Sequence, residues 1–529
     1  GNVPDVDVND LEARIVEATR RWQDDLSDAL REQFGEERGT RALRRYAQAF
    51  PAAYREDYAA RMAVRDVELI EPLLSVGHAV PVEASDATPL AMQLYRPLEA
   101  APGTLRFKIY QAGEPIALSR SLPMLEHLGV RVNDERPYRI EPADTGVVWM
   151  HDFGMTSLDG ADVDLENARL RFEEAFARIW AGDVENDDLN RLVLRAGLTW
   201  REVRILRAYA KYIRQVGSTF SNAYIENALT GNPSISGMLV RLFLARFDPG
   251  LAAPDRASQA ERLRAQIHAA LEDVPNLDED RILRQFLGVL EATLRTNYFQ
   301  TGKDGVTQKR YLSFKFDPSK VPGLPEPKPM FEIWVYSPRV EGVHLRGGRV
   351  ARGGLRWSDR REDFRTEVLG LVKAQMVKNT VIVPVGSKGG FVVKQPPSPG
   401  DRDAYLAEGV ACYQTFLRGL LDLTDNYVDG QLVPPSQTVR IDGDDPYLVV
   451  AADKGTATFS DYANAISAEY GFWLGDAFAS GGSVGYDHKK MAITARGAWE
   501  SVKRHFSEMG VDTQTQDFTV VGIGDMSGD

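Results

Sequence analysis

The spacing of hydrophobic residues changes several times along this chain, and this change most limits how the chain can fold. Apolar residues recur with the period of an α-helix over residues 9–71, led by Leu11, Ile15 and Ala18, and again over residues 165–298. Around residues 105–109 and 331–337 they follow strand-like patterns instead. Since roughly 100 to 200 residues make one domain, the 529 residues predict several domains of different class.

We therefore expect a multidomain protein of mixed α/β and α+β class. Strand-like residues 105–109, a helix with Leu118, Leu122 and Leu125, and strand-like segments at 130–132 and 146–150 give a β-α-β-β order. This order is typical of a ferredoxin-like (ACT-like) unit. Such a unit serves either as a regulatory domain or as plain scaffold, and its residues name no ligand. The expected divisions are a helical segment 1–90, the ferredoxin-like unit 91–160, a helical region 161–300, an α/β domain 301–515 and the start of a Rossmann domain 516–529.

Composition and charge exclude several classes of function. The 63 Lys and Arg against 76 Asp and Glu give a formal net charge of −13, which repels nucleic acid and anionic membranes. The single cysteine, Cys412, excludes intrachain disulfides and multi-thiolate metal sites, and it favours a reducing compartment. The acidic N-terminal sequence lacks the features of a signal peptide, and no apolar run approaches the roughly 18 residues of a membrane span. We expect a soluble, cytoplasmic protein, and no metal, because the seven histidines show no ligand spacing.

The candidate chemistry is concentrated in residues 350–394. A glycine turn, Gly353-Gly354, lies between Arg352 and Arg356 and precedes a predicted amphipathic helix over 363–378 that ends in Lys378. The apolar run 381–385 then predicts a buried strand with the sequence GSKGG, residues 386–390, at its carboxyl end. Ligands bind at that end of the strands in open α/β sheets.

Lys388, at the centre of GSKGG, is a candidate for acid/base catalysis. Its glycine neighbours allow close approach of a ligand, and burial beside Lys378 and Arg352 would disfavour the ammonium form. The alternative is a solvated lysine on a glycine-rich turn. The spacing differs from GxxxxGK[ST], which argues against a phosphate-binding P-loop.

Two further segments suggest site residues. A predicted strand over 446–450 places Asp453 at a strand end, as a catalytic acid or as a turn residue, and Ser460 would cap the next helix. A predicted strand over 518–521 precedes Gly522 and Gly524, which are typical of a dinucleotide-binding turn. The chain stops at Asp529, before the helix expected after such a turn. We therefore expect a piece of a longer protein that is inactive by itself.

Taken together, these motifs resemble glutamate dehydrogenases. ARGGLR, the helix ending in VKN, PVGSKGG, AADKGT, GGSVGYDHKKMAITARG and VVGIGDMSG occur in the order seen in that family. The resemblance is closest to the very large NAD-specific class of bacteria, and it is most specific in residues 351–360 and 375–391. It implies a glutamate-dehydrogenase-type substrate domain over 301–515 and reversible oxidative deamination of L-glutamate to 2-oxoglutarate and ammonia, with hydride transfer to NAD.

The resemblance also implies a role for each matching residue. Arg352 corresponds to the basic residue that holds the side-chain carboxylate of the substrate, and Lys378 to the lysine that binds its α-carboxylate. Lys388 corresponds to the catalytic lysine, and Asp453 to the aspartate that exchanges protons with the amino group. The smaller enzymes of the family usually carry lysine where Arg352 stands, which keeps the charge and changes the donor geometry.

For the cofactor, Thr494 corresponds to the threonine near the nicotinamide, and Gly522 and Gly524 to the glycines of the pyrophosphate loop. The preference for NAD over NADP comes from the resemblance alone. We also expect a homo-oligomer and an amino-acid effector bound by residues 1–300. The alternative function is a non-catalytic amino-acid sensor that retains a dehydrogenase-like pocket.

Overall fold

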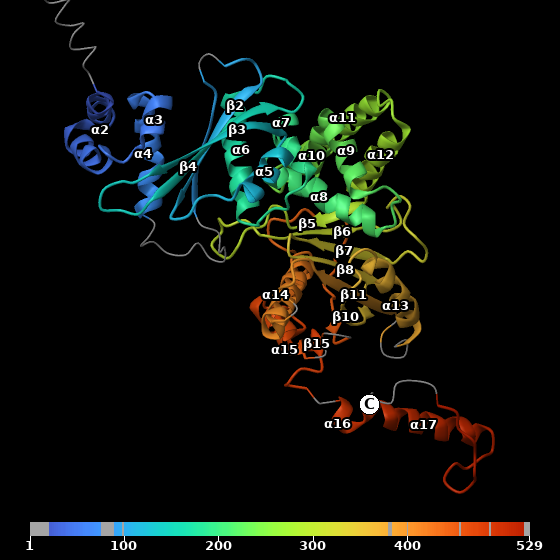
Figure 1. Cartoon of the computed structure of the whole chain (residues 1–529). Coiled ribbons are helices and arrows are strands. Elements are labelled where there is room, and N and C mark those ends of the chain that lie inside the picture. Colours follow the sequence, from blue (N-terminus) through green and yellow to red (C-terminus); the bar gives the residue numbers. More distant parts are fainter. Residues whose placement is uncertain are drawn as a thin grey trace, which may run out of the picture. The chain divides into compact units, whose positions relative to one another are not determined.

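The computed structural model divides the chain into two compact units. The first comprises Gly1–Arg207 and Ala223–Val240, and the second Ala208–Asn222 and Arg241–Asp529 (Figure 1). The structure describes residues 21–75, 89–97, 100–378, 383, 385–398, 400–453, 456, 458–485 and 488–522.

The first unit begins with three helices, α2 (Trp22–Tyr46), α3 (Ala52–Asp57) and α4 (Ala60–Ser75). Gly35 interrupts α2 with a φ of 78°, a conformation that glycine adopts at little cost. A Cβ atom on Gly39 would lie 2.7 Å from the Cα atom of Arg31, so the two halves of α2 pack closely against each other. The helical prediction is therefore confirmed from residue 22 onward, while Leu11, Ile15 and Ala18 lie outside the described residues.

A four-stranded antiparallel sheet follows, in the order β1-β2-β4-β3. The predicted β-α-β-β order is present as β2, α5, β3 and β4, and β1 adds an edge strand beside β2 that the sequence analysis did not anticipate. The bounds of these elements are β1 (Leu90–Tyr95), β2 (Thr104–Ala112), α5 (Leu118–His127), β3 (Val130–Ile140) and β4 (Val148–Ser157).

Strand β2 carries the core of this unit on both faces because successive side chains of a strand alternate. Phe107 packs edge-on against Phe172 of α6 (Leu165–Trp180), with ring centroids 5.2 Å apart. The neighbouring Lys108 is buried with Asp66 of α4, at an Nζ–Oδ2 distance of 2.9 Å, and Tyr110 donates to the same carboxylate. The sheet thus binds α6 through apolar contacts and α4 through a buried ion pair.

The middle of the chain is helical, as predicted, up to residue 292. The helical prediction to 298 is wrong for β5 (Thr293–Thr296), because this segment pairs antiparallel with β6 (Leu312–Phe316). The helices are η2 (Asp188–Arg191), α7 (Leu192–Arg195), α8 (Trp200–Gln215), α9 (Asn222–Gly231), α10 (Pro233–Phe247), α11 (Ala253–Leu271) and α12 (Leu277–Ala292).

The second unit contains a seven-stranded mixed sheet. Its order is β10-β11-β8-β7-β6-β5, with β9 also paired to β11. Strand β11 runs antiparallel to β8 and parallel to β9 and β10. The further strands are β7 (Phe331–Tyr336), β8 (Val340–Arg346), β9 (Ala351–Arg352), β10 (Leu355–Trp357) and β11 (Val385–Val393).

Two helices cover the faces of this sheet, α13 (Phe364–Lys378) and α14 (Arg402–Leu421) (Figure 1). A Cβ atom on Gly390 would meet Val368 of α13 at 2.6 Å, whereas the adjacent Phe391 packs on Phe416 of α14. Helix α13 begins one residue after its predicted start and ends where it was predicted to end.

The predicted position of GSKGG is wrong. Strand β11 begins at Val385 and contains GSKGG, instead of delivering it to a loop. The physical reason is the close approach of α13: a Cβ atom on Gly386 would lie 2.3 Å from the carbonyl oxygen of Gln375. These glycines therefore permit helix–strand packing within a strand. Residues 381, 382 and 384 of the predicted strand lie outside the described residues.

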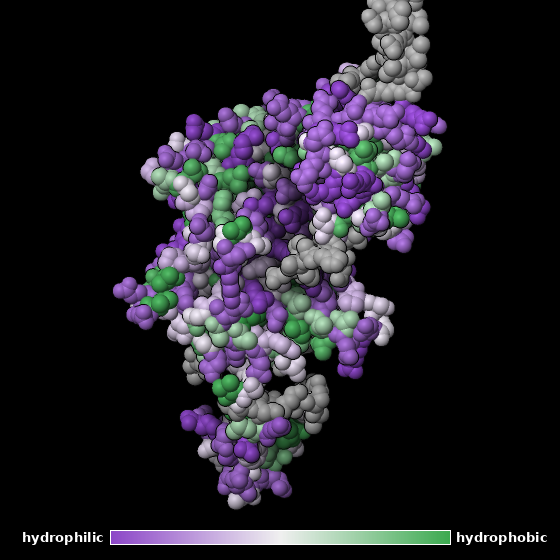
Figure 2. Space-filling model, turned by 90° about the vertical axis from the view of Figure 1, so that its left-hand side faces the viewer, coloured by the Kyte–Doolittle hydropathy of each residue, from purple (hydrophilic) through white to green (hydrophobic). Residues whose placement is uncertain are grey.

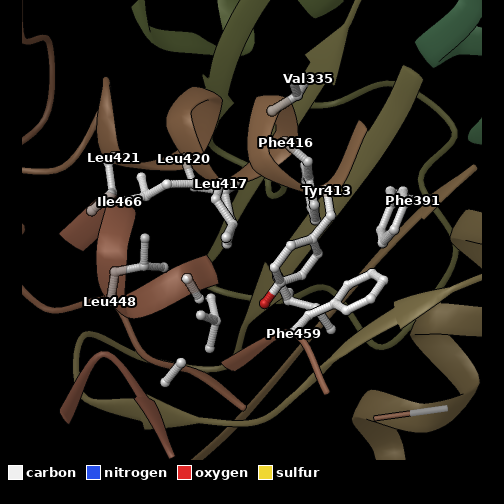
Figure 3. Packing of buried hydrophobic residues seen from close by; sticks show 14 of the residues in the cluster. Val335, Phe391, Tyr413, Phe416, Leu417, Leu420, Leu421, Leu448, Phe459 and Ile466 are labelled. Atoms are coloured by element: carbon white, nitrogen blue, oxygen red, sulfur yellow. The ribbon is translucent and has the colours of Figure 1, made fainter. Parts of the chain in front are cut away.

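Figure 3 shows how α14 packs on α15 (Ser460–Glu469) and on the sheet. Tyr413 of α14 lies between Phe391 and Phe459, with ring centroids 5.9 and 5.1 Å away. The other elements of this part are β12 (Asn426–Val428), β13 (Gln431–Val433), β14 (Val450–Ala451), η3 (Gly475–Ala477), β15 (Ala479–Ser480), α16 (His488–Met491) and α17 (Ile493–Glu508).

Three local predictions for this part need correction. The strand predicted over 446–450 is reduced to β14, because only Val450 and Ala451 find a parallel partner, in β15. Ser460 is the first residue of α15 rather than its cap, and its hydroxyl donates to the carbonyl oxygen of Ser480 instead. Residues 518–521 form no strand, since a strand requires a ladder partner and no described strand lies beside them.

The surface is mainly hydrophilic on the face drawn in Figure 2, with scattered hydrophobic residues. Within the described part of the chain, no helix is both long enough and apolar enough to span a membrane.

Substituting Gly342 of β8 tests the packing of α14 on the sheet. A Cβ atom there would lie 2.4 Å from the buried ring of Phe416, so Gly342→Ala should reduce the free energy of unfolding by about 1–3 kcal/mol. The matched control is Gly370→Ala on the exposed face of α13, where a Cβ atom meets nothing within 4 Å. It should be neutral or stabilising by up to about 1 kcal/mol. Urea unfolding midpoints measure both, and equal midpoints would contradict the packing argument.

Candidate functional site

The glycine turn between β9 and β10 brings two distant strands together. Gly353 accepts a hydrogen bond from the amide of Ala451 at 3.1 Å, and Gly354 accepts one from the amide of Gly389 at 3.0 Å. A Cβ atom on Gly353 would lie 1.5 Å from the carbonyl oxygen of Ser387, so no larger residue fits in this backbone arrangement. The turn therefore lies between β11 and β14, close to the two residues singled out from the sequence.

Lys388 and Asp453 form an ion pair beside this turn. The Nζ atom lies 2.5 Å from Oδ2 of Asp453, and the side chains are 10% and 18% exposed. Sequence reasoning expected the cations Lys378 and Arg352 near Lys388, and the ion pair adds a carboxylate to that environment, while the side chain of Lys378 lies outside the described part of the structure. Since β14 ends two residues before Asp453, the prediction that Asp453 follows a strand is confirmed.

Arg356 of β10 also contacts Asp453, a contact that the sequence analysis missed. Its Nε atom lies 3.4 Å from Oδ2 of Asp453, and its Nη1 atom donates to Glu367 of α13 at 3.0 Å. Burial lowers the pKa of Arg356, but the hydrogen bond to Glu367 and the charge of Asp453 outweigh it, so the pKa is raised. The sequence does contain an indication of this role, because Arg356 is the final residue of the ARGGLR motif. From the sequence, however, it was considered only as a neighbour of the glycine turn.

Thr456 holds the backbone of Asp453. Its hydroxyl accepts the amide of Asp453 at 3.0 Å and donates to the carbonyl oxygen of Leu355 at 2.8 Å. This link ties the segment after β14 to β10. Nothing in the sequence pattern singled out this threonine.

The two predicted substrate anchors lie on β9 and α13, which both contact β11. Arg352 is in β9, partly exposed and paired with Gly386 of β11, and no hydrogen bond or ion pair joins its side chain to the residues that the structure describes. Lys378 is the last residue of α13, and its side chain lies outside the described part of the structure. The geometry of a paired anchor therefore stays a prediction.

The predicted cofactor residues lie further along the chain. Thr494 is exposed in the first turn of α17, and Gly522 lies in an exposed segment without regular secondary structure. Gly524 lies outside the described residues.

A buried network of charges holds the segment that leads to β14. Asp445 pairs with Arg346 of β8 and Lys315 of β6, at 3.0 and 2.7 Å, and its amide donates to Asp425 at 2.7 Å. Asp425 in turn pairs with Arg295 of β5 at 2.9 Å. Each of the five residues is at most 2% exposed. Burial alone would raise the pKa of Asp445, but the charges of Arg346 and Lys315 hold it well below its usual range.

The donor chemistry of the described residues does not suggest a metal centre. No group of three or more His, Cys, Asp or Glu side chains that could hold a metal ion occurs among them.

Family models match most of the chain. Residues 266–529 match "Bacterial NAD-glutamate dehydrogenase, catalytic domain", and residues 89–168 match "Glutamate dehydrogenase, ACT3 domain". Helical motif 3 of glutamate dehydrogenase matches residues 184–249, and helical motif 2 matches residues 29–73.

Curated relatives agree with these matches. The chain is 54% identical to the NAD-specific glutamate dehydrogenases of Halomonas elongata over 523 residues and of Pseudomonas aeruginosa over 527 residues. It is 50% identical to that of Mycobacterium tuberculosis over 543 residues. Each comparison covers 99% of this chain and 32% of the relative. This chain belongs to the bacterial NAD-specific glutamate dehydrogenase family. It spans about a third of the length of the curated relatives it matches.

Within this family member, Asp445 provides a test of the buried charge network. Asp445→Asn should lower the free energy of unfolding by about 3–5 kcal/mol at neutral pH, because it leaves Arg346 and Lys315 without their shared carboxylate. Since the folded pKa of Asp445 is depressed, its stabilisation is present above the unfolded pKa and is lost as pH falls. The difference between wild type and variant should therefore shrink below about pH 4.

Urea midpoints across this pH range measure the effect. The control is Asp444→Asn, whose side chain is 63% exposed and pairs with Arg440, and it should change stability by less than about 1 kcal/mol. A difference for Asp445→Asn that is small at neutral pH, or that grows as pH falls, would contradict the assigned role.

Proposed function

We propose that the protein containing this chain is an NAD-dependent glutamate dehydrogenase. It carries out reversible oxidative deamination of L-glutamate to 2-oxoglutarate and ammonia, with hydride transfer to NAD. The observation that carries this proposal is the Lys388–Asp453 pair, 2.5 Å apart beside the ARGGLR turn. The names of relatives 50–54% identical to the chain, all NAD-specific glutamate dehydrogenases, support the substrate and the cofactor.

Substrate binding requires two cations because glutamate is a dicarboxylate. In the proposal, Arg352 binds the side-chain carboxylate and Lys378 binds the α-carboxylate. The partly exposed position of Arg352 on β9, next to the strand of Lys388, supports its role. A guanidinium can bind a carboxylate through two parallel hydrogen bonds, which orients the substrate as well as holding it.

Proton transfer is assigned to the ion pair. Asp453 accepts a proton from the substrate ammonium, which must lose it before the α-carbon can be oxidised. Lys388 then activates the water that attacks the imine and stabilises the resulting carbinolamine. The short Nζ–Oδ2 distance supports this division of labour, because a proton can pass between the two groups without movement of the backbone.

The predicted cofactor residues fit a dinucleotide in their chemistry. Bound NAD supplies the hydride acceptor. Thr494 offers an exposed hydroxyl, and the space around Gly522 is open, with no atom within 4 Å of a Cβ position. In the proposal, Thr494 lies near the nicotinamide and Gly522 and Gly524 approach the pyrophosphate, as in other dinucleotide turns that begin a Rossmann domain.

The N-terminal unit is assigned regulatory and assembly roles. The match of residues 89–168 to an ACT3 domain and the sheet order β1-β2-β4-β3 support a ferredoxin-like, ACT-like unit. We assign an amino-acid effector to residues 1–300, a homo-oligomeric state and a cytoplasmic location to the full-length protein. The non-catalytic sensor is less well supported, because sensing requires no partly buried lysine–aspartate pair.

Substitution of Lys388 tests the proposed activity. In the full-length protein, Lys388→Ala should lower kcat for glutamate-dependent NADH formation by at least about 100-fold, since it removes an acid/base group. Asp453→Asn should have an effect of similar size. NADH absorbance measures the rates, and circular dichroism checks that the variants fold.

Lys373→Ala, on the exposed face of α13, is the control and should retain wild-type activity. The proposal fails if the wild type forms no NADH with glutamate, or if Lys388→Ala retains near-normal kcat.

A further inference from the structure

Two cations from adjacent parallel strands share the carboxylate of Asp453. Lys388 belongs to β11, and Arg356 belongs to β10, where it pairs with Gly390. Both approach the same oxygen, Oδ2, at 2.5 and 3.4 Å. An aspartate that exchanges protons with a substrate needs only one partner for that step, so the second cation requires its own explanation.

Arg356 also contacts a second carboxylate, that of Glu367. Glu367, in the first turn of α13, accepts from Nη1 of Arg356 at 3.0 Å and from the hydroxyl of Ser358 at 2.6 Å. The guanidinium therefore bridges two carboxylates that belong to α13 and to the segment after β14. Its side chain is 20% exposed, and those of Glu367 and Asp453 are 16% and 18% exposed. A planar guanidinium can bridge in this way, whereas the compact ammonium of a lysine cannot reach both acids with the same geometry.

We infer that Arg356 is a positioning residue that orients the Asp453 carboxylate toward Lys388 and stabilises its anionic form, and that Glu367 moderates this effect. This inference rests on the proposed function, because it assigns a purpose to Arg356 in the proton transfer of Asp453. Lys388 from β11 and Arg356 from β10 face Asp453, and Glu367 of α13 contacts Arg356 in turn. The raised pKa of Arg356 keeps this cation charged throughout the working range of pH.

Three variants of the full-length protein separate charge from geometry. Arg356→Met should lower kcat about 10- to 100-fold, because the carboxylate loses its orientation, and should change KM for glutamate by less than about threefold. The acid limb of kcat/KM against pH should move up by about one pH unit, because a lost cation makes the carboxyl harder to ionise. Arg356→Lys keeps the charge and should restore the acid limb without restoring kcat. Glu367→Gln removes an anion and should move the acid limb downward.

The matched control is Arg360→Met. Arg360 is 49% exposed and pairs with Asp363 of the same segment, so this variant should keep the wild-type kcat and pH profile. Stopped-flow and steady-state NADH absorbance with glutamate and NAD supply all the rates. An active wild type together with an Arg356→Met variant of unchanged kcat and pH profile would overturn this inference and leave the proposed function intact. A raised KM with unchanged kcat would overturn it too, because Arg356 would then bind substrate. An inactive wild type would instead overturn the proposed function.

Discussion

The close backbone contact between the Gly353-Gly354 turn and its two neighbouring strands is the constraint on which the candidate site depends. The turn binds β11 through the amide of Gly389 and β14 through the amide of Ala451. Lys388 and Asp453 lie 65 positions apart in the sequence, and the turn is one of the contacts that bring their strands together. A Cβ atom on either glycine of the turn would push the strands apart, so the absence of a side chain at these two positions permits the contact.

Helix α13 and the charges around Asp445 support the elements that meet at this turn. Helix α13 lies so close to β11 that Gly386 and Gly390 leave no room for a Cβ atom. The charges around Asp445 anchor the segment that runs into β14. Buried ion pairs add little net stability compared with apolar packing, but breaking one is costly, so such a network favours one arrangement over its alternatives.

Sequence reasoning predicted the helices and the pairing partners unequally well. Helix α13 was predicted to within one residue, because its apolar residues repeat with a clear helical period. Strand β11 was misplaced, since glycine-rich GSKGG is typical of a turn and only the nearby helix explains it as a strand. Lys388 and Asp453 were both selected, whereas Arg356, Glu367 and Thr456 were given no role. Their functions depend on hydrogen bonds across β10, α13 and the segment after β14, and no spacing rule links those segments.

Local patterns in the sequence identified most of the elements and their order along the chain, the acidic and cysteine-poor character of the protein and, through its motifs, the resemblance to the family. These properties depend on local periodicity and on short runs of residues, which a sequence records directly. Long-range packing set the rest: that Lys388 pairs with the Asp453 carboxylate, that Arg356 contacts the same carboxylate, and that GSKGG lies within a strand. Those outcomes depend on contacts between residues far apart in the chain, where the energy of packing and charge pairing exceeds any local preference.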